Sequence, residues 1–162
     1  MARLCRLRAD ANTVSMASYR DDAPGGIPMV APSIETIEEI AGEALASIPE
    51  TFRRHAGNVH IHVVDFPDED VEKEMKLESP FDLLGLYQGV SMAERSVDHV
   101  ANDIDRIFLY RRPILDYWCD SGEDLAHVVR HVLIHEIGHH LGLSDEDMEA
   151  IEALAEDRAA TD

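Results

Sequence analysis

The first regular pattern of apolar positions begins after Pro32. Ser33 can accept a hydrogen bond from the first turn of a helix, and helical spacing continues from there to Pro49. The apolar positions with this spacing are Ile34, Ile37, Ile40, Ala41, Ala44, Leu45 and Ile48. The acidic positions between them are Glu35, Glu38, Glu39 and Glu43. The pattern predicts one amphipathic helix that buries its isoleucines and exposes its glutamates.

Three segments in the middle of the chain have the pattern of strands. Residues 59–66 alternate valine and isoleucine with histidine, which predicts a half-buried strand. Leu83–Val90 is a short apolar run that contains glycines, and Ile104–Tyr110 is a second apolar run. We expect a strand in each of these runs. Pro113 follows Ile104–Tyr110 and predicts the end of that strand.

The acidic run Asp68–Glu74 follows Pro67 and predicts an exposed loop. Clustered carboxylates can bind calcium. This run lacks the ligand spacing of a dedicated calcium-binding loop, so we assign it no metal.

Helical spacing returns in the last third of the chain. Leu125, Val128, Val129, Val132, Leu133 and Ile137 share one helix face. Ser121 with Asp124 resembles a capping box at the start of this helix, and Gly142 predicts its end.

A final helix is expected after Ser144, a good N-cap residue. Three acids follow in its first turn, where negative charge suits the helix dipole: Asp145, Glu146 and Asp147. Its predicted buried side consists of Met148, Ile151, Leu154 and Ala155.

The most informative segment is His135–His139, with the sequence His-Glu-Ile-Gly-His. Helical residues four apart lie on the same face, so both imidazoles can point at one ion. Glu136, beside the first histidine, can then take a proton from a water held by the metal. Gly142 can adopt the positive φ that turns the chain back, and this turn can deliver Asp145 as a third ligand.

Other residues compete for roles in this site. Glu149 and Glu152 can supply the third carboxylate in place of Asp145, which can instead be a helix-capping acid. Histidines also stand at positions 127 and 131, but each step of four residues turns about 40° around a helix. We therefore expect His127 and His131 at the solvent-exposed edge. His140 faces elsewhere on the helix and is not a ligand candidate.

Length and charge narrow the class of protein. At 162 residues the chain fits one domain, which we place at 33–162 after a flexible leader at 1–32. The formal net charge of −19 disfavours nucleic acid or an anionic membrane as a partner and suits a basic peptide or protein. Cys5 and Cys119 form no disulfide framework, and no signal peptide or transmembrane run is present, so we expect a cytoplasmic location.

The motif from His135 through His139 and Gly142 to Asp145 resembles the metzincin signature, with Asp where most members have His. The string HEIGHHLGLSDEDM is similar to the small bacterial minimal zincins, a metallopeptidase-like family with a matrix-metalloprotease-type fold. The resemblance covers most of Ser33–Ala155. It implies an α+β domain with a small mixed sheet, a packed first helix and a metal-binding helix. It also implies that His135, His139 and Asp145 bind zinc and that Glu136 is the general base.

Two hypotheses of function follow. The first is a zinc-dependent peptidase whose extended substrate pairs with an edge strand, Gly85–Gln88 being a candidate. Tyr87 and Tyr110 are candidates to stabilise the oxyanion. The second is a non-proteolytic, metal-stabilised protein-binding module on the same scaffold, because the methionine turn of typical metzincins has no equivalent after Asp145 and Met148 stands too close to it.

Overall fold

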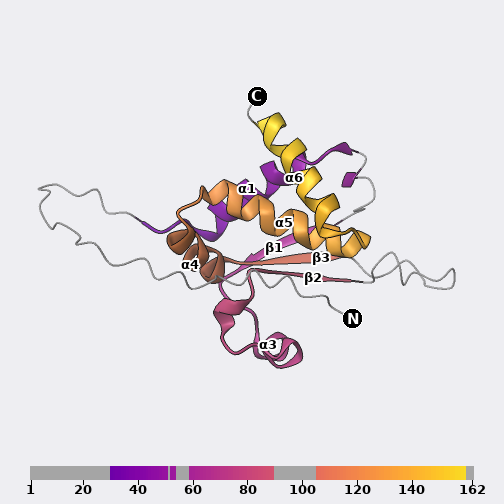
Figure 1. The fold of residues 1–162 in the computed structure, drawn as a ribbon. Coiled ribbons are helices and arrows are strands. Elements are labelled where there is room, and N and C mark those ends of the chain that lie inside the picture. Colours follow the sequence, from indigo (N-terminus) through magenta and orange to yellow (C-terminus); the bar gives the residue numbers. More distant parts are fainter. Residues whose placement is uncertain (1–29, 51, 54–58, 90–104, 160–162) are drawn as a thin grey trace, which may run out of the picture.

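The computed structural model describes residues 30–50, 52–53, 59–89 and 105–159. Its elements in chain order are α1 (Ile34–Ser47), β1 (His60–Val64), α3 (Glu69–Met75), the 3-10 helix η1 (Pro80–Asp82), β2 (Gly85–Gln88), β3 (Arg106–Tyr110), α4 (Arg111–Ser121), α5 (Leu125–Leu141) and α6 (Asp145–Ala159). Helices α1, α5 and α6 lie on one side of a small sheet, and α3 lies on the other (Figure 1). The predicted α+β class is confirmed.

The sheet is mixed and has the strand order β1-β3-β2. β1 runs parallel to β3, pairing His60 with Arg106, and β2 runs antiparallel to β3, pairing Gly85 with Leu109. All three strands were predicted from the sequence. In the described part of the chain β2 therefore forms an antiparallel edge of the sheet, beside α5.

The main core lies between the sheet and the helices α1, α5 and α6. Ser33 caps α1 by accepting a hydrogen bond from the Thr36 amide, and the predicted glutamate face of α1 is exposed. A second, smaller cluster formed by Leu83, Leu86 and Tyr110 packs with apolar residues of α3 and its neighbours. The amphipathic prediction for α1 is confirmed.

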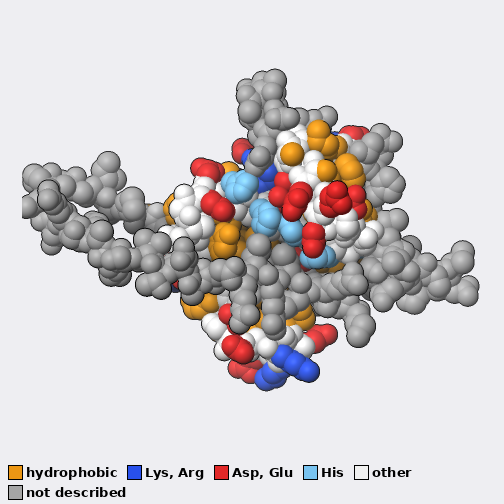
Figure 2. Space-filling model, in the orientation of Figure 1, with side chains coloured by type: hydrophobic (Ala, Val, Ile, Leu, Met, Phe, Trp, Pro, Cys, Tyr) orange, Lys and Arg blue, Asp and Glu red, His pale blue; other side chains and the backbone are white. Residues whose placement is uncertain are grey.

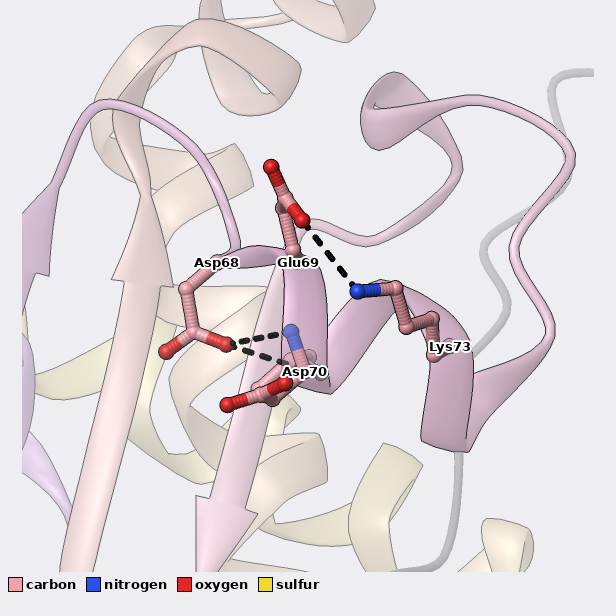
Figure 3. Close-up of polar contacts among 5 residues, drawn as sticks. Asp68, Glu69, Asp70 and Lys73 are labelled. Atoms are coloured by element: carbon pink, nitrogen blue, oxygen red, sulfur yellow. Dashed lines mark hydrogen bonds and ion pairs between the residues drawn. The ribbon is translucent and has the colours of Figure 1, made fainter.

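The acidic run at 68–74 is a helix, so the predicted loop is wrong. Asp68 caps α3: its carboxylate accepts hydrogen bonds from the backbone amides of Asp70 and Val71 (Figure 3). Glu69 and Lys73, four residues apart, form an exposed ion pair at 3.1 Å. The first carboxylate of the run thus accepts hydrogen bonds from amides in the first turn of a short helix. The Glu69–Lys73 pair adds to the stability of that helix, whereas the sequence pattern alone favoured a loop.

The strand before Pro113 ends at Tyr110, as predicted, but the sequence pattern does not predict helix α4, which follows at once. Pro113 stands in the first turn of α4, where a helix tolerates proline because the first amides have no partner within the helix. The next helix, α5, is capped by Asp124, whose carboxylate accepts a hydrogen bond from the Ala126 amide at 2.8 Å. Ser121 belongs to the end of α4, so the predicted capping box at Ser121 is wrong.

The end of α5 agrees with the sequence. Gly142 has φ 72° and closes the helix. Ser144 and Asp147 then cap α6 reciprocally, because the Asp147 carboxylate accepts from the Ser144 amide and the Ser144 hydroxyl accepts from the Asp147 amide. Met148 is among the buried residues of α6, together with Ile151 and Ala155, whereas Leu154 is 52% exposed, contrary to its prediction.

The predicted leader at 1–32 lies almost entirely outside the described residues. Within the described part of the chain, no helix combines the length and the apolar character that crossing a bilayer requires.

Candidate active site

Four histidines form a continuous row along α5. The ring centroids of His127 and His131 are 6.5 Å apart, those of His131 and His135 are 4.2 Å apart, and those of His135 and His139 are 6.1 Å apart. Figure 2 shows histidine side chains in a row across this face of the molecule, with acidic side chains beside them. The row places imidazoles where an ion can approach from solvent.

Glu152 of α6 reaches the middle of this row. Its Oε1 lies 2.5 Å from Nδ1 of His131 and 3.9 Å from Nε2 of His135. The His131 side chain is 26% exposed, so it lies at the partly exposed edge of α5, but it contacts a carboxylate there instead of facing solvent alone. Helix α6 packs along α5 and places the Glu152 carboxylate beside His131. The angular positions of residues on α5 alone cannot predict this contact.

The pKa shifts of His135 and Glu152 favour the protonation states that bind a metal ion. Burial, followed by the neighbouring His131, lowers the pKa of His135, so its imidazole is neutral at pH 7. Burial acts to raise the pKa of Glu152, but the hydrogen bond and charge of His131, together with His135 and His127, outweigh it and lower that pKa. A neutral imidazole and an ionised carboxylate are the forms that bind a divalent cation.

Asp145, the predicted third ligand, is the exposed first residue of α6. The cap of α6 is made by Ser144 and Asp147, so Asp145 is not the capping acid. Its negative charge acts on His135, to a smaller extent than that of Glu152. Glu149, the other alternative, is exposed. The described geometry therefore brings Glu152 into the histidine row and leaves Asp145 at its border.

Glu136 is completely buried, as its place among apolar residues predicts. Its Oε2 accepts a hydrogen bond from the Tyr87 backbone amide at 2.8 Å. Among the described residues Oε1 has no hydrogen-bond partner. Burial raises the pKa of Glu136 to about 8, although the bond from Tyr87 acts in the opposite direction. A buried carboxyl with one unsatisfied oxygen is expensive, and such groups recur at catalytic sites.

The amide that Glu136 binds lies on the β2 edge of the sheet formed by the described residues. The Tyr110 amide donates to the Leu84 carbonyl, and bonded pairs alternate along an antiparallel ladder. The amides of Gly85 and Tyr87 therefore point away from β3. Gly85 also permits the close approach of β2 to α5, because a Cβ there would lie 2.7 Å from a Val132 methyl carbon.

A buried polar cluster behind Tyr87 was missed in the sequence. The Tyr87 hydroxyl donates to Asp105 at 2.5 Å, and Nε2 of His140 lies 3.8 Å from the other Asp105 oxygen. The rings of Tyr87 and His140 are 4.3 Å apart. His140 faces away from the histidine row, as expected. Its burial beside Asp105, the residue before β3, depends on tertiary packing and has no signal in the sequence. The cluster anchors β2 at the residue whose amide binds Glu136.

The two tyrosine hydroxyls give no direct support to an oxyanion role. That of Tyr87 is bound to Asp105, and Tyr110 is buried in the smaller apolar cluster around Leu83. Burial raises the pKa of Tyr110.

The residues present fit a zinc ion. Neutral imidazoles and carboxylates are the donors that zinc takes in hydrolases, and the histidine row brings them to one accessible face next to a buried carboxyl with an unsatisfied oxygen.

A comparison with known protein families supports this assignment of the fold and site. The sequence profile of a family described as zincin-like metallopeptidase matches residues 56–154, which include β1 through most of α6. No curated protein matches the chain.

Proposed function

The chain belongs to the zincin-like metallopeptidase family, and from this membership and the site geometry we propose that it is a zinc-dependent peptidase. The observation that carries the proposal is the buried Glu136 carboxyl, one residue from His135, with an oxygen that has no partner among the described residues. The Tyr87 amide occupies only the other oxygen of this carboxyl.

We assign zinc binding to His135 and His139 of α5, with Asp145 at the start of α6 as the third ligand. Two imidazoles and one carboxylate would hold the ion and leave room on it for a water molecule, as a catalytic site requires. When bound, zinc polarises the scissile carbonyl and makes a water molecule more acidic.

Glu136 would act as the general base. In this role it accepts the proton of the attacking water and then donates it to the leaving amine. A pKa raised to about 8 by burial suits a group that must both accept and release a proton near neutral pH. The Tyr87 amide holds one carboxylate oxygen and leaves the other, which has no partner among the described residues, for proton transfer.

An extended peptide would bind beside β2. The backbone groups of Gly85 that point away from β3 can form main-chain hydrogen bonds with an extended peptide. Glu136 lies at the same edge, because it accepts the hydrogen bond of the Tyr87 amide. The strongly negative chain favours peptides that carry basic residues.

The test is cleavage of a peptide library, containing basic and acidic members, by the zinc-loaded protein. Glu136→Gln keeps the shape of the side chain and its acceptor for the Tyr87 amide but cannot take a proton, so turnover should vanish. Glu146→Gln, at an exposed position of α6, should cleave like the unmodified protein. Undiminished cleavage by Glu136→Gln would refute the assignment of the base. Failure of the zinc-loaded protein to cleave any peptide would refute the peptidase.

A further inference from the structure

His131, His135 and Glu152 form a compact set of possible metal ligands. One ligand atom from each lies within 4.8 Å of the other two. Two of the residues come from successive turns of α5 and the third from α6, and all three are partly buried. Imidazole nitrogen and carboxylate oxygen are the donors that zinc and similar divalent ions accept together.

The spacing of these atoms is close to that around one ion. Zinc lies about 2.0–2.2 Å from nitrogen and oxygen ligands, so two ligands of a tetrahedral ion are roughly 3.3–3.6 Å apart. Nε2 of His135 is 3.9 Å from Oε1 of Glu152, near that value. Nδ1 of His131 is 2.5 Å from the same oxygen, so these two atoms must separate by about 1 Å to admit an ion.

The orientation of His135 is the second observation. Its ring lies 4.2 Å from that of His131 but 6.1 Å from that of His139, and its Nε2 faces Glu152. His135 is thus turned toward His131 and α6 rather than toward His139. A neutral imidazole has one nitrogen lone pair for a metal, so the same ring cannot serve two ions at once.

We propose that His131, His135 and Glu152 form a second position for a divalent transition-metal ion, which shares His135 with the position assigned to catalysis. The two positions exclude one another, so the chain holds one ion that distributes between them. An ion held by His131, His135 and Glu152 lacks the His139 ligand that the catalytic assignment requires. Only the description of the other position as catalytic rests on the proposed function.

The experiment removes each position separately and measures metal binding. Cobalt(II) is added to the full chain, and its visible absorption reports both affinity and ligand set. His139→Gln leaves the second position intact and should still bind one cobalt ion per chain. Adding Glu152→Gln to it should weaken binding at least about tenfold, whereas adding Glu146→Gln, at an exposed position of the same helix, should leave binding unchanged.

Equal affinities for His139→Gln with and without Glu152→Gln would overturn the proposal and leave His131 and Glu152 as an ordinary ion pair. A folded His139→Gln variant that binds no cobalt would overturn it too. Circular dichroism shows whether this variant folds. If it does not, histidine-ring NMR of the unmodified chain decides: zinc should shift the ring nitrogen signals of His131, and unshifted signals would contradict the second position.

The outcomes for this position and for the peptidase are separable. Loss of the second position leaves peptide cleavage and its dependence on Glu136 intact. Absence of cleavage leaves the cobalt affinities of the His139→Gln series unaffected.

Discussion

Glu136→Gln should make the metal-free protein more stable at high pH, although it removes a side chain that we assign to catalysis. Glu136 is completely buried, and only one of its oxygens has a hydrogen-bond partner among the described residues. Ionising such a group costs folding free energy, because water solvates the charge in the unfolded chain and the protein interior does not. Glutamine keeps the acceptor for the Tyr87 amide and carries no charge at any pH.

The sign and size of the effect follow from the raised pKa. The unfolded carboxyl titrates near 4.5 and the folded one at about 8. Below pH 4.5 both states are protonated and the contribution of Glu136 to stability is fully present. As the pH rises from 4.5 to about 8, only the unfolded state releases its proton, so stability falls, and it levels off above about 8. At about 1.4 kcal/mol per pKa unit, the loss is on the order of 5 kcal/mol.

The assay is urea denaturation of both proteins, in the presence of a chelator, across this pH range. The difference in free energy of unfolding below pH 4.5 reports the change in packing and hydrogen bonding alone. The growth of that difference toward pH 8 reports the titration of Glu136, because the other ionisable groups are common to both proteins. A difference that stays constant with pH would refute the raised pKa of the buried Glu136 carboxyl.

Two further substitutions test the packing that holds the site. Gly138→Ala should lower the free energy of unfolding by about 1–3 kcal/mol, since its Cβ would lie 2.2 Å from the sulfur of buried Met148. Gly42→Ala, also in a helix but with nothing within 4 Å, should raise it by up to about 1 kcal/mol in the same denaturation experiment. Tyr87→Phe should cost about 1–3 kcal/mol by removing the hydroxyl that donates to buried Asp105; thermal unfolding that matches the unmodified protein would contradict this role.

The parts of the fold that the sequence predicts are those in which one local signal dominates. The spacing of apolar residues predicts the buried face of α5 and the burial of Met148 in α6. The backbone freedom of glycine predicts the end of α5 at Gly142. The errors arose where one residue type has two local meanings. Asp68 in an acidic run is a helix cap, and Pro113 both follows the end of β3 and lies in the first turn of α4.

The same division holds for the site. Burial of Glu136 was predictable, because its neighbours on the helix are apolar. The contacts of His131 with Glu152 and of Tyr87 with Asp105 join residues that are distant in sequence, and no period along the chain encodes them. They depend on how α6 and β2 pack against α5, which only tertiary structure determines.

The most direct test of a zinc site on α5 is the zinc content of the purified, zinc-loaded protein beside His135→Ala and His127→Ala. His135 belongs to both proposed metal positions, whereas His127 stands at the end of the row and belongs to neither. We expect about one zinc ion per chain in the unmodified protein and in His127→Ala, and none in His135→Ala. Zinc retained by His135→Ala, or absent from all three proteins, would contradict the account.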